Sequence, residues 1–291
     1  MTLPPPSAVV AGVAGLAVEC RTDDPEMRRR FAEIVPPTSP LPDWPRQIYE
    51  VRRNTDGQLV VTTDDLPLGC TPHPGNAVAA IECDVKRATE AYHPGGIWLH
   101  AGALARDNGS TLLCIGVSGA GKSSATFALL GAGWRYLADD AALLDPVDRT
   151  LVGLGWPLRL ITLPAPPETL AKSGFTVTHD QRVAIGKELT SKFRLTPPPA
   201  SVWNGTVPAR LDRCLFLERG PLALEPLTPG QALLRLWPRR IRRSDGREPW
   251  EPGALAARLS GVRFAVLRTE RIDQVVPAVT GWMGGKREQA G

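Results

Sequence analysis

The sequence contains little that is typical of secreted or membrane proteins. Its five cysteines, in 291 residues, form no CxxC pair, which argues against a disulfide framework and against a structural zinc site. No window approaches the roughly 18 to 20 apolar residues that a membrane helix needs. The N-terminus also has no basic stretch followed by a long apolar one. We therefore expect a soluble cytoplasmic protein that does not enter a membrane.

The charge balance is also unremarkable, with a net charge of +4 at pH 7. The strongest basic cluster is short, so the composition does not predict a nucleic-acid partner. That cluster consists of Arg239, Arg240, Arg242 and Arg243. Its arginines could bind an acidic peptide or another anion, or they could form a solvated face. With 43% hydrophobic residues, the chain has the composition of a folded protein of one or two domains.

The first 95 residues predict a small α+β domain. A capped helix is expected at 24–35, because acidic residues and a proline stand at its start. Two strands at 47–53 and 58–63 flank a turn and predict a hairpin. Residues 76–92 have the apolar spacing of an amphipathic helix. The breakers at 93–96 then mark a domain boundary, which we place after residue 95.

Residues 96–291 predict a second domain of the α/β class. It opens with strands at 98–106 and 111–117, which could pair as a hairpin. A glycine-rich loop, a helix at 122–130 and a strand at 135–138 follow, and together they form a compact strand, loop, helix and strand unit. Further strands are predicted at 141–144, 158–163 and 214–217, and further helices at 168–173 and 229–236.

The strongest motif is the glycine-rich loop, which matches the P-loop pattern GxxxxGK[ST] between a strand and a helix. Its backbone amides and the helix N-terminus can cradle phosphates, while the lysine reaches the terminal phosphates and the serine can ligate magnesium. An ordinary glycine-rich turn is the alternative. The motif predicts a nucleoside triphosphate with Mg²⁺ as the ligand. The expected binding residues are Gly116, Val117, Ser118, Gly119, Ala120, Gly121, Lys122, Ser123 and Ser124.

Two adjacent carboxylates, Asp139 and Asp140, follow the apolar run that ends at Ala138. They should therefore lie at the carboxyl end of a strand beside the P-loop, where acidic residues bind the magnesium ion of a nucleotide. One carboxylate could hold the metal while the other accepts a proton from an attacking hydroxyl group. An Asp-Asp pair can also simply cap a turn.

Other polar residues are weaker candidates. His100 precedes the P-loop strand by one strand and could approach the phosphates or the acceptor, although a lone histidine is about as often structural. Lys187, Lys192 and Arg194 could supply a cation to the transferring phosphoryl group, or they could be structural.

Three motifs occur in a fixed order, at 99–102, 113–124 and 133–140, and they resemble the catalytic domain of the HPr kinase/phosphorylase family. The resemblance is specific over about residues 100 to 145. It implies a P-loop kinase core like that family's C-terminal domain and like phosphoenolpyruvate carboxykinase, with ATP and magnesium as ligands and serine phosphorylation as the reaction.

The same resemblance assigns roles to individual residues. Asp140 is similar to the family's proton acceptor, Asp139 to its metal-side neighbour and His100 to its active-site histidine. Lys122 and Ser123 are similar to its phosphate and magnesium contacts.

The chain also differs from the true HPr kinases. Their acidic metal ligand in a glycine-rich signature has no counterpart in residues 153–164, which contain no acidic residue. This difference argues against phosphorylase activity and against HPr as the substrate. The chain looks more like smaller related kinases, some of which phosphorylate precursor peptides, including lasso-peptide precursors.

Three functions remain open at the level of sequence. The first is a kinase that transfers the γ-phosphoryl group of ATP to a serine of a peptide or small protein, and such an enzyme could form a homo-oligomer. The second is a small-molecule kinase of the same fold. The third is a nucleotide-gated peptide-binding module without catalysis, which would need fewer acid/base groups than this sequence has.

Overall fold

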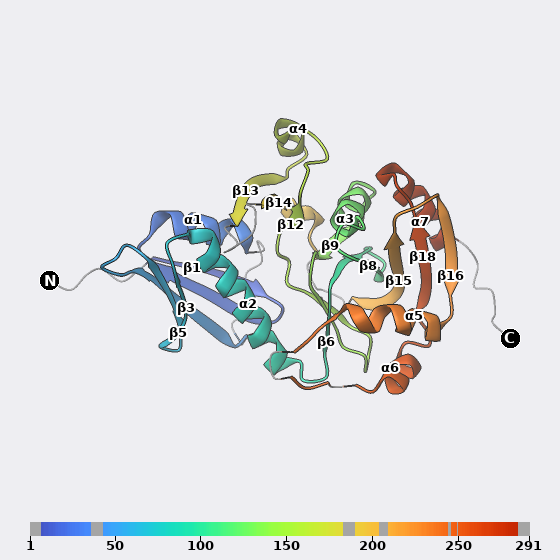
Figure 1. The fold of residues 1–291 in the computed structure, drawn as a ribbon, viewed down its shortest axis with the longest axis horizontal. Helices are drawn as coiled ribbons and strands as arrows, with labels where there is room; N and C mark the ends of the chain where they lie inside the picture. Colours follow the sequence, from blue (N-terminus) through green and yellow to red (C-terminus); the bar gives the residue numbers. More distant parts are fainter. Residues whose placement is uncertain are drawn as a thin grey trace. The chain divides into compact units, whose positions relative to one another are not determined.

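The computed structural model describes residues 7–35, 43–182, 190–203, 209–243, 246–248 and 250–284. The fold is mixed α/β, with four β-sheets and seven α-helices among these residues (Figure 1). The chain divides into two compact units. Unit 1 comprises Met1–Gly96, Gly153–Asn204 and Arg243–Arg247, and unit 2 comprises Ile97–Val152, Gly205–Arg242 and Glu248–Gly291.

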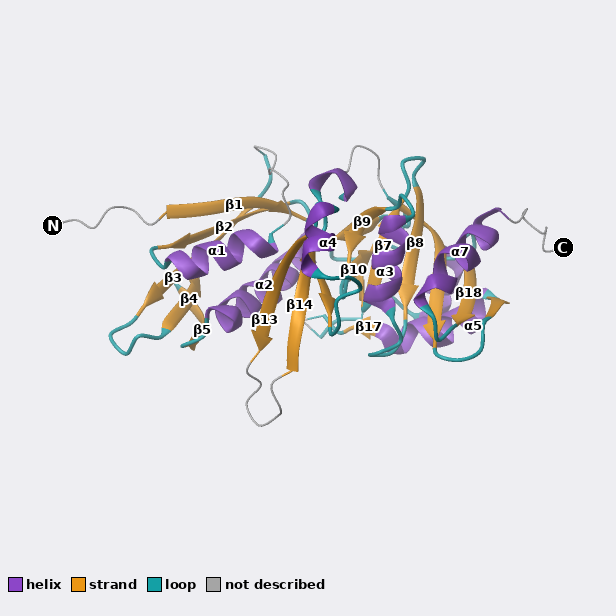
Figure 2. Ribbon diagram, turned by 90° about the horizontal axis from the view of Figure 1, so that it is seen from above, coloured by secondary structure: helices purple, strands orange, loops and turns teal. Residues whose placement is uncertain are grey.

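Unit 1 contains a five-stranded sheet on which two helices pack (Figure 2). Its strands, in sheet order, are β1 (Ser7–Val13), β2 (Leu16–Thr22), β3 (Arg46–Arg53), β4 (Leu59–Thr63) and β5 (Leu66–Thr71). Helix α1 spans Pro25–Ile34 and α2 spans Pro74–Tyr92. Both predicted helices and the predicted β3–β4 hairpin are confirmed. The hairpin of β1 and β2 was not predicted.

The start of α1 shows why the local sequence folds as predicted. The Asp24 carboxylate accepts a hydrogen bond from the Met27 amide at 2.8 Å, and Pro25 occupies the first helical turn. This cap satisfies one of the amides that a helix leaves open at its N-terminus. Met27, Phe31 and Ile34 form the buried face of the helix.

A second sheet in unit 1 has the order β12-β14-β13 and is accompanied by a short helix. Its elements are β12 (Leu158–Leu160), α4 (Pro167–Lys172), β13 (Thr176–Arg182) and β14 (Thr190–Thr196). The sequence predicted one domain from residue 96 onward, whereas 153–204 pack within unit 1. A buried ion cluster accounts for the difference, because Glu82 of α2 pairs with Arg159 at 2.5 Å and with Arg194 at 2.6 Å.

Unit 2 is built around a six-stranded sheet with the order β16-β18-β15-β8-β7-β9. In that order the strands span Ala223–Leu227, Arg263–Arg268, Arg210–Glu218, Ser110–Ile115, Ala101–Ala105 and Arg135–Ala138. Strands β8, β15 and β18 run parallel, β7 is antiparallel to β8, and β9 is antiparallel to β7. The carboxyl ends of β8, β9, β15 and β18 therefore share one edge with the beginning of β7.

The helices of unit 2 are α3 (Lys122–Gly131), α5 (Pro229–Leu236), α6 (Pro252–Arg258) and α7 (Val275–Gly284). Helix α3 packs on β7, β8 and β9 and also contacts α7 (Figure 1). The predicted α3 and α5 are confirmed, whereas α6, α7 and β18 were not predicted.

The predicted strand at 98–106 is wrong in one respect, because it is divided. Its first part is β6 (Ile97–Leu99), which lies in a separate sheet of order β11-β10-β6-β17 with Leu151–Gly153, Ala142–Leu144 and Arg240–Ile241. Its second part is β7, and His100 stands at the break. No helix in the part of the chain that the structure describes is long and apolar enough to cross a membrane.

Candidate active site

The site residues come together because of the strand directions in unit 2. The P-loop follows β8, and Asp139 and Asp140 follow β9, which runs parallel to β8 with β7 between them. His100 immediately precedes β7, whose first residue is paired with the last residue of β8. The loops at the carboxyl ends of parallel strands are where α/β sheets bind ligands.

The P-loop needs glycine at specific positions. A Cβ atom on the buried Gly116 would lie 2.9 Å from the Ala120 Cβ and 2.9 Å from the Leu217 carbonyl oxygen. Gly121 has a φ of +93° and forms the N-cap of α3, without a side-chain cap and without an acidic residue in the first turn. The amides at this helix start are therefore available to an anion.

The other predicted loop residues differ in exposure. Val117, Ser118 and Gly119 are exposed, whereas Ser123 and Ser124 lie partly exposed in the first turn of α3.

Lys122 is folded over the loop. Its side chain is largely buried, and its Nζ donates to the carbonyl oxygens of Gly116 at 3.0 Å and Val117 at 3.2 Å. Burial lowers the pKa of Lys122, while the charges of Asp139 and Asp140 act in the opposite direction. Both carboxylates therefore lie close enough to Lys122 to affect its charge, and their negative charge favours the ammonium form.

Asp139 occupies a tightly packed position. It is only 5% exposed and lies beside Gly102 of β7 and Thr126 of α3. A Cβ atom on Gly102 would stand 2.3 Å from the Thr126 Oγ1 and 3.6 Å from the Asp139 Oδ1. Glycine at position 102 therefore makes room for the Thr126 hydroxyl.

Asp140 differs from its neighbour in exposure and in its backbone. Its side chain is 47% exposed, and its φ is +71°, which aspartate tolerates better than most residues. The His100 Nδ1 lies 3.0 Å from the Asp140 carboxylate Oδ1 and 3.0 Å from its carbonyl oxygen. Both are acceptors, so Nδ1 carries a proton.

The arginine cluster does not act as one surface. Arg240 stacks on Trp237 at 4.0 Å and pairs with Glu248 at 2.8 Å. In unit 1, Arg243 donates to the carbonyl oxygens of Glu90, in the last turn of α2, and of His93, just after that helix. Arg239 lies at the active site of unit 2: its carbonyl oxygen accepts from the His100 amide at 3.0 Å, and its charge is among the causes that lower the pKa of Lys122.

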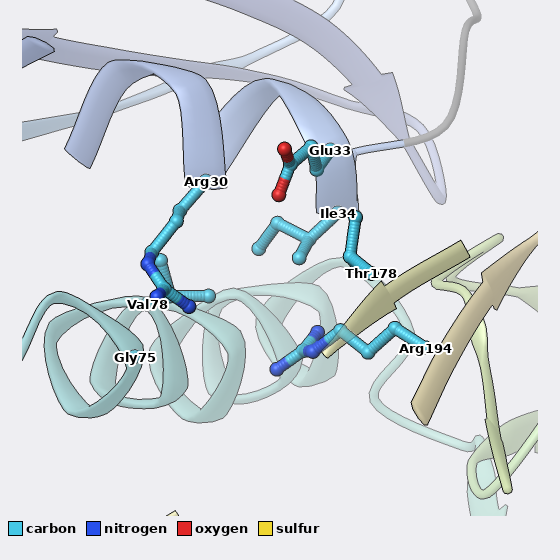
Figure 3. A pocket seen from close by; sticks show the side chains of 7 residues that line it. All are labelled: Arg30, Glu33, Ile34, Gly75, Val78, Thr178 and Arg194. Carbon is cyan, nitrogen blue, oxygen red and sulfur yellow. The ribbon is translucent and has the colours of Figure 1, made fainter. Parts of the chain in front are cut away.

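Of the three predicted cations of the later segment, the structure describes the side chain of Arg194 alone. Arg194 is buried in the ion cluster with Glu82, and it lines a cavity of about 20 Å³ between α1 and the start of α2 (Figure 3). That cavity has room for a single water molecule. Lys192 belongs to β14, and its side chain, like the whole of Lys187, lies outside the described residues.

Two residues beside the P-loop lysine fit a metal ion that also binds a nucleotide. No group of three or more histidine, cysteine, aspartate or glutamate side chains suited to a metal occurs among the described residues. Mg²⁺ is commonly held by one or two protein ligands together with substrate phosphates and water. Ser123 in the first turn of α3 and Asp139 fit that pattern, since both stand next to the P-loop lysine.

Two residues at the site were missed by sequence reasoning. Arg219 follows β15 and its Nε donates to the Gly119 carbonyl oxygen at 3.1 Å, which fixes the tip of the P-loop. Its place after a predicted strand was the available signal. Thr126 lies one helical turn beyond Lys122, and nothing in its local sequence indicated a role.

Comparison with known proteins adds little. No protein-family model matches the chain, and no curated protein matches it. A solved structure that resembles it is the Hpr(Ser) kinase/phosphatase from Coxiella burnetii, at 14% identity and a TM-score of 0.31, covering 65% of this chain and 99% of that chain. A TM-score of this size does not establish a shared fold, so the function must be inferred from the residues of this chain.

Proposed function

We propose that this protein is an ATP- and Mg²⁺-dependent kinase that phosphorylates a serine hydroxyl of a peptide or small protein. The observation that carries the proposal is the meeting of a P-loop lysine, two aspartates and a histidine at one edge of the unit 2 sheet. We also propose the narrower fold assignment, a P-loop core similar to that of HPr kinases and phosphoenolpyruvate carboxykinase, on the strength of the ordered motifs.

The chain's residues divide the work as follows. The loop amides and Lys122 bind the β- and γ-phosphates, while Ser123 and Asp139 hold the metal, which neutralises phosphate charge when bound. Asp140 accepts the proton of the attacking hydroxyl group. The hydroxyl oxygen bonds to the γ-phosphorus while the bond between that phosphorus and the bridging oxygen of ADP breaks. The Nδ1–H of His100 donates a hydrogen bond to the Asp140 carboxylate and so orients it.

The exposure of the two aspartates supports this assignment. A metal ligand benefits from a fixed, buried carboxylate, whereas a base must reach an incoming hydroxyl group. Asp139 is buried and Asp140 is accessible.

The test is transfer of labelled γ-phosphate from ATP to a library of serine-containing peptides and small hydroxyl compounds. Asp140→Asn should still bind ATP and lose at least about 100-fold in transfer rate. Asp107→Asn is the matched control, because Asp107 is an exposed aspartate of the same unit that pairs with Arg135. Undiminished transfer by Asp140→Asn would refute the assigned base, and labelling of small compounds alone would move the proposal to the small-molecule kinase.

A further inference from the structure

A cavity of about 150 Å³ lies on the side of the P-loop away from the two aspartates. Three loops line it, and each follows one of the parallel strands: Gly119–Gly121 after β8, Arg219 after β15, and 269–272 after β18. Helix α7 begins at its far wall with Val275. The convergence of three carboxyl-end loops is the arrangement in which open α/β sheets bind ligands.

The walls of the cavity combine apolar surface with a few polar groups. Leu217 and Val275 are buried beneath it, and Ile272 lies at its rim with 45% of its surface exposed. Arg219 is held by the Gly119 carbonyl oxygen, and Glu270 presents an exposed carboxylate. A hollow that combines apolar surface with placed polar groups is typical of sites for organic ligands.

The rim is also fixed in shape. The Thr269 hydroxyl accepts from the Arg271 amide at 3.0 Å and donates to the Gln274 Oε1 at 2.6 Å. These bonds hold the turn that carries Ile272, so the apolar rim is formed before any ligand arrives.

We propose that this cavity binds the base and ribose of the nucleoside triphosphate, with Ile272 packed against the base and Glu270 accepting from ribose hydroxyls. This inference rests on the proposed function. The P-loop follows β8, which lies between β15 and β18 on one side and β7 and β9 on the other. The γ-phosphate must face Asp140 beyond β7, so the nucleoside leaves the loop on the opposite side.

The test compares the binding of two ligands by calorimetry, each with Mg²⁺: ATP and inorganic tripolyphosphate. The full chain should bind ATP more tightly, because only ATP has a nucleoside. Ile272→Ala should weaken ATP binding by about tenfold, through the lost apolar contact, and leave tripolyphosphate binding unchanged. Leu234→Ala is the matched control, since Leu234 is an exposed aliphatic residue of α5 outside the cavity.

The outcomes separate the two proposals. Lys122→Ala should weaken both ligands, which would establish the phosphate site independently of the nucleoside. The nucleoside cavity would be overturned if the full chain bound both ligands with equal affinity. It would also be overturned if Ile272→Ala bound ATP normally or lost both ligands alike. The P-loop assignment would stand in each of these cases. If the full chain binds neither ligand, the proposed function fails and this inference fails with it.

Discussion

The packing behind Asp139 permits a quantitative prediction about Gly102. An alanine there would place its Cβ 2.3 Å from the Thr126 Oγ1, whereas ordinary contacts of a Cβ begin at 3.4 Å. About 1 Å of overlap must be absorbed by neighbours in a buried region, and overpacking of this kind costs about 1 to 3 kcal/mol of the free energy of unfolding. The neighbour that must move is Thr126 of α3, the helix that begins at Lys122 of the P-loop, so Gly102→Ala should also weaken Mg²⁺-dependent ATP binding.

The same geometry predicts which second substitution restores stability. Thr126→Ala removes Oγ1, and the next contacts of the new Cβ, 3.6 Å from the Asp139 Oδ1, are then ordinary. The double variant should recover about 1 to 2 kcal/mol relative to the sum of the single variants. Thr126→Val is the control, because it keeps an atom at the Oγ1 position and should restore nothing. By itself it should be nearly neutral, since the Thr126 hydroxyl has no hydrogen-bond partner among the described residues.

Urea unfolding followed by tryptophan fluorescence measures these free energies, and calorimetry measures the binding of ATP with Mg²⁺. Additive effects of Gly102→Ala and Thr126→Ala would refute the proposed steric contact. Rescue by Thr126→Val as complete as rescue by Thr126→Ala would do the same.

Three further predictions concern charge and burial. Burial lowers the pKa of Lys122 from 10.5, so its ammonium group should lose its proton below that pH. ATP affinity should therefore fall as pH rises through this range, by up to about tenfold per pH unit. Lys122→Ala should lack this fall, and the same pH profile in the variant would contradict the role of the ammonium group. Iodoacetamide at pH 8 should label only the exposed Cys70 and Cys83 of the native chain, as mass spectrometry can show, because burial raises the pKa of two of the other three thiols to about 12. Glu82→Gln should destabilise unit 1 by about 3 kcal/mol in urea unfolding, since it removes a buried charge that pairs with both Arg159 and Arg194. A change below about 1 kcal/mol would show that the ion cluster is not structural.

The parts of the site that the sequence predicted are those built from contiguous segments. The strand, glycine-rich loop and helix around Lys122 are specified by neighbouring residues, and the hairpin that precedes them is confirmed as β7 and β8. The position of Asp139 after β9 also follows from a local apolar run. Local propensity and periodicity are sufficient for such units.

The parts that the sequence did not predict depend on contacts between distant segments. The sequence left open whether Arg194 serves a phosphoryl group or the structure, and the carboxylate with which it pairs, Glu82, lies 112 residues earlier in the chain. The strand predicted at 98–106 divides at His100 because β6 pairs with β10 and β17, which come from later segments. Neither pairing leaves a signal in the residues next to it.

The backbone at Asp140 explains how two adjacent aspartates can serve one site. Consecutive side chains of an extended strand point to opposite faces, so an unbroken β9 would direct only one carboxylate toward the P-loop. Strand β9 ends at Ala138 and the positive φ of Asp140 breaks that alternation, and both carboxylates act on the charge of Lys122. The same conformation determines which variants test the chemistry. Asparagine tolerates a φ near +71°, whereas alanine there costs about 1 to 2 kcal/mol in backbone strain. A loss of transfer in Asp140→Asn therefore reports on the carboxylate itself, while a loss in Asp140→Ala would combine the chemistry with a distorted turn.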